Sequence, residues 1–397
     1  MKFNKWTLGL AAVGAVSMAS AVRADDAPKL SALNTALSST TISGYVDVAA
    51  QYNAGDPGGK ISPTGAGYTG AVNQPGYSFN NSGKVDNFSL NNVTVSLDKP
   101  EDDSPWASGY HIDLNAGSDA INVGSGNFGV RQAYIALRTP VGNGIDWKVG
   151  VFDGITGYEV NTAYLNPNYT RSYGYTVNPA SELGLLGTYK INNIVSVVAG
   201  YANRNSNNGG VVGLSSHDVI GSVALTAPDS WGWFKGSALN LQTIQGFDNG
   251  SVNNYSVNGT FNTPIANLAV GLAYDKLQGL GYNEGGDGNI YGVYVTYQAT
   301  DKLKFAARGE YLDGQNFGGL LNNGTGSGTP ASGKGEEVTF TVEYDLWANV
   351  TSRLEARWDH VESGTAFNNG SGQVVPGVNP ASTENSILIA LNLVYKF

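Results

Sequence analysis

The sequence contains no cysteine and only three histidines, His111, His217 and His360. Without cysteine, the chain can form neither disulfide bonds nor thiolate metal sites. No two of the histidines have the spacing of a metal-binding pair, and the sequence has no nucleophile elbow. We therefore expect no metal, no other cofactor and no enzymatic activity.

Long apolar runs are missing as well. Beyond the first residues, no segment approaches the about 18 uninterrupted apolar residues that indicate a transmembrane helix. The N-terminus has Lys2 and Lys5, then the apolar stretch Leu8–Ala21, then small residues up to Ala24. This order is typical of a signal peptide, which we assign to residues 1–24. The formal net charge of −10 argues against a nucleic-acid partner.

Glycine and tyrosine are abundant, with 54 and 22 residues, whereas only 14% of residues are charged. This composition favours strands and turns over long helices. The C-terminus shows the pattern clearly, because Ile387, Ile389 and the following odd-numbered positions are apolar, whereas Asn392 and Lys396 lie on the other row. Alternation of this kind predicts a strand with one apolar face.

About sixteen such segments follow one another along the chain. We place them near 41–52, 85–98, 106–117, 128–139, 145–153, 181–190, 194–203, 215–227, 233–245, 252–262, 267–278, 289–299, 302–313, 336–346, 350–362 and 384–397. The gaps between them alternate between short turns and mostly longer Gly/Asn-rich loops. This asymmetry predicts an all-β transmembrane antiparallel β-barrel over 41–397, with short periplasmic turns and longer external loops. Residues 25–40 would form an N-terminal periplasmic segment.

Three consecutive strands near the C-terminus carry charged rows. A charged side chain facing lipid would cost about 2–4 kcal/mol at the membrane midplane, so these rows should face inward and line a hydrated lumen. The alternative is a soluble sandwich or barrel, in which the polar row faces bulk water; the signal peptide, the strand count and the loop asymmetry favour the membrane barrel. The expected lumen-lining charges are Lys304, Arg308, Glu310, Glu343, Asp345, Arg353, Glu355, Arg357 and Asp359.

Three features carry a resemblance to a known family. They are Thr41-Ile42-Ser43-Gly44-Tyr45-Val46-Asp47, the segment from Asn166-Pro167-Asn168-Tyr169 to Tyr175, and the terminal Phe397. With these the mature chain resembles the Putative β-barrel porin-2 (OmpL-like) family. The resemblance implies an outer-membrane channel for small solutes, and it implies no catalytic residues.

The third external loop, Gly154–Ala180, differs from the other long loops because it is rich in aromatic residues. Aromatic side chains favour burial, and the lumen wall offers it. By analogy with general-diffusion porins, we expect this loop to fold inward; an external lid or a subunit contact is the alternative. The expected constriction residues are Glu159, Tyr164, Tyr169, Arg171, Tyr173 and Tyr175.

The sequence thus predicts a porin in the outer membrane of a Gram-negative bacterium, which allows passive diffusion of small hydrophilic solutes and ions. Its partners would be membrane lipid, these solutes and, through the C-terminal strand and Phe397, the barrel assembly machinery. A monomer and a homo-oligomer such as a trimer both fit. Two other functions remain open: a substrate-specific channel, for example for sugars stacking on the loop tyrosines, and a non-conducting surface adhesin or scaffold.

Overall fold

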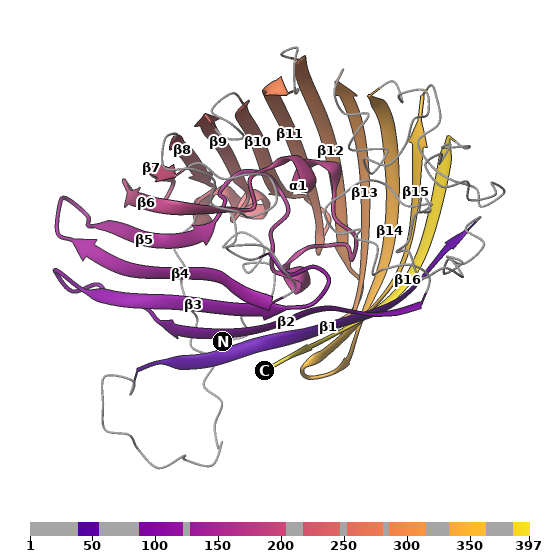
Figure 1. Cartoon of the computed structure of the whole chain (residues 1–397), viewed down its shortest axis with the longest axis horizontal. Helices are drawn as coiled ribbons and strands as arrows, with labels where there is room; N and C mark the ends of the chain where they lie inside the picture. Colours follow the sequence, from indigo (N-terminus) through magenta and orange to yellow (C-terminus); the bar gives the residue numbers. More distant parts are fainter. Residues whose placement is uncertain are drawn as a thin grey trace, which may run out of the picture.

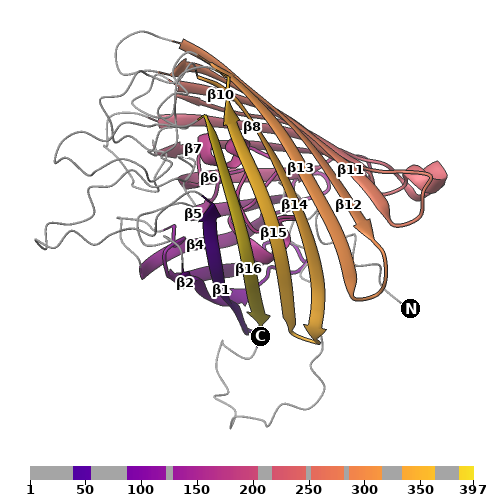
Figure 2. The same cartoon turned by 90° about the vertical axis from the view of Figure 1, so that its right-hand side faces the viewer.

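A computed structural model describes residues 39–54, 87–121, 128–203, 217–246, 252–280, 286–314, 333–362 and 384–397. The predicted signal peptide, 1–24, lies outside the described residues, as does nearly all of the predicted periplasmic segment 25–40. Figures 1 and 2 show the described part as strands wrapped around a common interior.

The described residues form sixteen strands. Each pairs antiparallel with the next strand in sequence, and β16 pairs with β1, so the sheet closes into a barrel. This confirms the predicted fold class. The strands are β1 Thr41–Ala54, β2 Asn87–Lys99, β3 Ser108–Ala116, β4 Phe128–Thr139, β5 Ile145–Asp153, β6 Ser181–Lys190, β7 Val195–Asn203, β8 His217–Thr226, β9 Ala238–Gly246, β10 Val252–Asn262, β11 Leu268–Leu280, β12 Gly286–Gln298, β13 Leu303–Gly314, β14 Lys334–Trp347, β15 Val350–Val361 and β16 Asn385–Lys396.

The direction in which the apolar and polar rows of each strand point distinguishes the membrane barrel from the soluble alternative. In β16, the apolar odd-numbered residues from Ile387 to Tyr395 point outward and keep 37–51% of their surface exposed. The even-numbered residues, including Ser386 and Asn392, are buried inside the barrel. A soluble barrel would bury its apolar row, whereas an outward apolar row suits hydrocarbon.

The predicted strand 233–245 begins later than expected. Asp229–Phe234 forms the 3-10 helix η3, which is interrupted by a kink at Gly232, and β9 begins only at Ala238. Trp233 therefore belongs to the turn, where its ring packs edge-on against Phe234 at 5.4 Å between centroids. None of the helices in the described part of the chain is long and apolar enough to cross a membrane.

The last residue of the chain completes the seam between β16 and β1, which lie side by side in Figure 2. The backbone N–H of Gly44 donates to the carbonyl of Phe397 at 2.9 Å, and the N–H of Phe397 donates to the carbonyl of Gly44 at 3.0 Å. A Cβ atom on Gly44 would lie 2.6 Å from the Phe397 ring and 2.2 Å from the carbonyl oxygen of Thr94. Only glycine fits under this ring.

We therefore predict that Gly44→Val lowers the yield of assembled barrel, measured as the heat-modifiable band in gel electrophoresis. The added side chain would displace both Phe397 and the backbone of β2. Ala50→Val is the matched control, because Ala50 lies on the same outward row of β1, opposite Leu391. Equal yields of the two variants would show that close packing at Gly44 is not needed for closure.

Candidate functional site

The segment between β5 and β6, residues 154–180, is called the third loop below. It lies inside the ring of strands (Figure 1). It contains the 3-10 helix η2, Ala163–Leu165, and the short helix α1, Tyr173–Val177. Its side chains reach distant strands: the Tyr158 hydroxyl lies 2.9 Å from that of Thr260 on β10, and the Asn168 amide donates to Thr341 on β14 at 2.7 Å.

Local hydrogen bonds shape the third loop. The Ser172 hydroxyl accepts from the backbone N–H of Tyr175 at 2.9 Å and so caps the start of α1. The Asn166 amide bonds both the N–H and the carbonyl of Val160, at 2.8 and 2.7 Å. Gly157 adopts φ +95°, and a Cβ atom there would approach the Asn178 side chain to 2.6 Å. These polar residues fix a compact turn structure before any contact with the wall is counted.

Carboxylates hold the third loop by its backbone N–H groups. Glu355 on β15 accepts from Tyr169 and, at 2.8 Å, from Thr170. Glu310 on β13 accepts from Tyr173 and, at 3.1 Å, from Gly174. Because these peptide groups are buried, each would be costly without a partner. The carboxylates remove that cost with charge-assisted hydrogen bonds.

Arginines of the same wall bind the carbonyl groups of the third loop. Arg308 donates to the carbonyl of Thr170 at 2.8 Å, and Arg357 donates to that of Arg171 at 2.5 Å. Arg353 reaches the carbonyls of Ala163 and Asn166, at 3.2 and 3.3 Å. Each sign of wall charge therefore meets the backbone group of opposite polarity.

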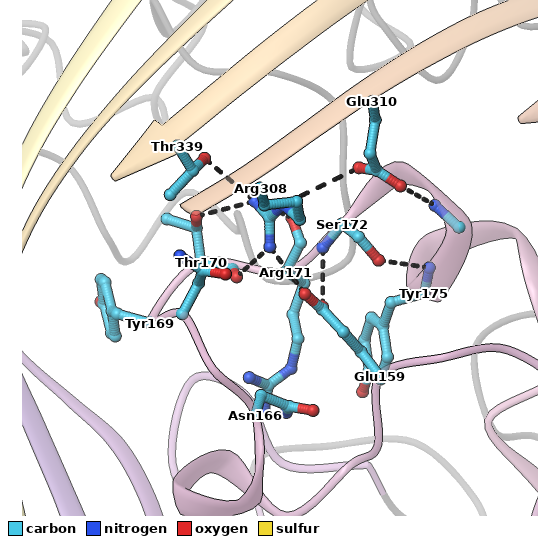
Figure 3. A network of polar contacts seen from close by, with 12 residues as sticks. Glu159, Asn166, Tyr169, Thr170, Arg171, Ser172, Tyr175, Arg308, Glu310 and Thr339 are labelled. Atoms are coloured by element: carbon cyan, nitrogen blue, oxygen red, sulfur yellow. Dashed lines mark hydrogen bonds and ion pairs between the residues drawn. The ribbon is translucent and has the colours of Figure 1, made fainter. Parts of the chain in front are cut away.

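Arg308 stands at the centre of this network (Figure 3). Its guanidinium lies 2.5 Å from Glu337 on β14 and 2.7 Å from Glu159 of the third loop. Glu159 also accepts from the backbone N–H of Ser172 at 2.8 Å. Only 1% of the Arg308 surface is exposed. One buried cation thus ties the wall to two points of the third loop.

The predicted lumen charges fall into a buried group and a partly exposed group. Arg308, Glu310, Arg353, Glu355, Arg357 and Asp359 are buried, and five of them bind the backbone of the third loop directly. Asp359 instead pairs with Arg357 at 2.7 Å and accepts from the Tyr173 hydroxyl at 2.6 Å. Lys304 and Glu343 pair with each other at 2.7 Å and are partly exposed, and Asp345 accepts from Thr351 at 2.9 Å.

The predicted tyrosines also divide into two groups. Tyr169 and Tyr173 are buried; Tyr169 packs with Ala49, Leu388 and Ala390 across the β1–β16 seam. Tyr164 and Tyr175 are half-buried.

Each half-buried tyrosine contacts one neighbouring ring or cation. Tyr164 meets Tyr45 edge-on at 5.2 Å between centroids. Tyr175 lies under the Arg171 guanidinium at 5.1 Å, and burial raises its pKa to about 12, so its hydroxyl stays neutral.

Arg171 is buried but differs from the other buried arginines. Its side chain donates to the carbonyl of Asn161 at 3.1 Å and stacks on Tyr175. Within the described part of the chain, no carboxylate lies within ion-pair distance of it, and its second terminal nitrogen has no hydrogen-bond partner. Among the buried arginines of the described residues, Arg171 therefore carries the least compensated positive charge.

Arg131 on β4 is a site residue that the sequence did not single out. It forms ion pairs with Asp153 and, at 4.0 Å, with Asp113, and it donates to Thr162 of the third loop at 3.0 Å. A β-bulge between Asp113 and Leu114 shifts the register here and brings Arg131 onto the inner row. A regular alternation cannot indicate a side chain that a bulge turns over.

A family model described as "Putative beta-barrel porin-2, OmpL-like" matches residues 39–397. The chain belongs to this family. It is therefore a porin of the Gram-negative outer membrane, as the outward apolar row already indicated. No curated protein matches the sequence significantly.

Solved porins and channels share the fold of this porin. OmpT of Vibrio cholerae in its trimer form is 14% identical, with 90% of this chain and 99% of that chain covered and a TM-score of 0.54. The anion-selective porin of Comamonas acidovorans is 12% identical, with coverage of 90% and 99% and a TM-score of 0.54. OprB of Pseudomonas putida is 12% identical, with coverage of 90% and 94% and a TM-score of 0.54.

The described residues contain no group of three or more His, Cys, Asp or Glu side chains arranged to hold a metal ion. The polar network around Arg308 is instead self-complementary, because its charges meet one another or the backbone of the third loop. Its chemistry is that of a structural clamp.

We predict that Arg308→Met lowers the free energy of unfolding of the porin by about 3–5 kcal/mol, because it leaves the buried Glu159 without its cation and Glu337 with only the 3.8 Å contact to Arg357. Chemical denaturation followed by tryptophan fluorescence measures this change. Lys304→Met is the matched control, since it removes a partly exposed cation from the same strand and should cost about 1 kcal/mol or less. Equal losses would contradict the central position of Arg308.

Proposed function

We propose that this porin is a passive diffusion channel for small hydrophilic solutes and ions, and that the third loop sets its narrowest section. The observation that carries the proposal is the clamp on the third loop, in which Glu310, Glu355 and Arg308 bind its backbone from the inner wall. A loop held at this many points keeps its place while solutes pass. Diffusion through such a bore needs no cofactor and no catalytic step.

The reach of the third loop supports its assignment as the constriction. Besides β13–β15, it contacts β4 through the bond from Arg131 to Thr162, and β1 through the ring contact of Tyr164 with Tyr45. Tyr158 stacks on Tyr294 of β12 at 4.0 Å between centroids. These contacts with several sides of the barrel mean that the third loop fills part of the bore. The narrowest section of a pore dominates its resistance and selectivity.

A sugar-specific channel receives less support. The proposed stacking track needs four accessible tyrosines in the third loop, but Tyr169 and Tyr173 are buried in contacts with the wall. Tyr164 and Tyr175 alone do not make a continuous track. General diffusion, with selectivity set by bore size and charge, is the function that the arrangement favours.

The outer surface and the C-terminal strand indicate the partners of this porin. The outward apolar row faces membrane lipid, and we propose that the β16 strand with Phe397 is the part that the barrel assembly machinery recognises. One related structure is described as a trimer form, that of OmpT. We propose a homo-oligomer, such as a trimer, for this porin as well.

Replacing residues 164–175 with a short Gly/Ser linker should raise single-channel conductance in a planar bilayer, because it removes the part of the third loop that crosses the barrel. Asn168→Ala is the control; it removes one contact to Thr341 and should leave conductance near that of the unmodified porin. The variants are compared only when the heat-modifiable band shows a folded barrel. Unchanged conductance in the folded linker variant would mean that the third loop is not the constriction.

Arg171→Gln should make the channel more cation-selective, because it removes a buried positive charge that lacks an ion pair within the described residues. The reversal potential in a KCl gradient measures the change. Lys302→Gln removes the same charge from an exposed turn, where salt screens it, and should have little effect. Equal shifts in the two variants would show that Arg171 acts only through net charge.

A further inference from the structure

His111 lies between two carboxylates on the inner wall. Its Nδ1 atom is 2.8 Å from Asp98 on β2. Its Nε2 atom is 3.1 Å from Asp113, which lies on β3, the same strand as His111. The interior position of this group follows from Arg131, which contacts both Asp113 and Thr162 of the third loop. The group therefore faces the space that the third loop narrows.

The two short contacts favour the protonated form of the ring. A neutral imidazole has a single N–H group, whereas both ring nitrogens donate in the imidazolium. Asp113 is itself an acceptor, because it receives hydrogen bonds from Ser96 and, at 2.8 Å, from Gln132. Nδ1 is hydrogen-bonded to Asp98, whereas Nε2 lies within ion-pair distance of Asp113 and 3.4 Å from the Gln132 amide nitrogen. Two carboxylates this close to one ring stabilise its positively charged form.

Other charged and titratable groups surround this ring. On β4, the Tyr134 ring stacks on His111 at 5.3 Å between centroids, and Arg131 lies near Asp113. Lys148 on β5 is 4.8 Å from the centre of the Tyr134 ring. Asp98 on β2 and Asp113 on β3 contact the ring directly, and Asp153 on β5 pairs with Arg131.

This group retains access to the barrel interior, in contrast to the network around Arg308. The side chains of His111 and Asp98 keep 19% and 29% of their surface exposed, whereas that of Arg308 keeps none. Charges that are partly exposed in a narrow pore act on passing ions more strongly than the same charges in bulk water. The charge of His111 is therefore felt on the permeation path.

We propose that His111 is a selectivity-determining residue of this channel. As an imidazolium it offsets the negative charge of Asp98 and Asp113, and this limits the preference of the pore for cations. When the ring loses a proton, it no longer offsets the two carboxylates, and the wall becomes more negative. This inference rests on the proposed channel function and adds the group that makes selectivity depend on pH.

The test is His111→Gln in planar bilayers with a KCl gradient. Glutamine keeps a polar side chain but carries no charge, so the cation-to-anion permeability ratio should rise by about twofold. Across a pH series, the unmodified porin should become more cation-selective as the ring deprotonates, and the variant should lack that step. Asp98→Asn should shift selectivity in the opposite direction, because it leaves the positive ring with one carboxylate fewer.

His217→Gln is the matched control, because His217 is exposed and stacks on the outward-facing Tyr201. It should change neither the permeability ratio nor its dependence on pH. If His111→Gln conducts normally with unchanged selectivity and an unchanged pH profile, the inference about His111 is wrong while the channel function stands. If the folded, unmodified porin does not conduct at any voltage, the proposed function itself fails.

Discussion

The need to satisfy buried peptide groups governs the interior of this porin. A loop that enters the barrel loses water from its backbone, and each N–H or carbonyl left without a partner is costly. The inner wall meets this need with charge, because Glu310 and Glu355 accept from the loop and Arg308, Arg353 and Arg357 donate to it. The charged rows that cannot face lipid thereby position the third loop.

On the proposed channel function, this use of charge determines which residues act on a permeating ion. An ion pair buried under the loop, such as that of Arg308 with Glu337, compensates itself and projects little field. Groups that remain partly exposed, such as Asp98 and His111, would interact more strongly with a passing ion. On the proposed channel function, we expect a few residues of β2 and β3, together with Arg171, to set the ion selectivity, although the chain as a whole carries a net charge of −10.

Strand positions and the direction of each row were predictable because both depend on a local period of two residues. The parity that placed Arg308 and Glu355 inside the barrel is such a local property, and so is the aromatic content of the third loop. The partners of these residues were not predictable, since Glu355 meets Thr170 across 185 positions of sequence. The burial of Tyr169, the bulge at Arg131 and the late start of β9 likewise depend on tertiary contacts that alternation does not encode.

Barrel closure and the position of the third loop depend on the same seam. Tyr169 packs on Ala49 of β1 and on Leu388 and Ala390 of β16, so its site exists only where these two strands are paired. Tyr164 likewise lies between Tyr45 of β1 and Lys396 of β16, with the Lys396 ammonium 5.3 Å from its ring centre. An open sheet cannot offer either site. The full set of contacts of the third loop therefore requires the strand that ends in Phe397 to be paired with β1, and the docked loop in turn adds contacts across that strand pair.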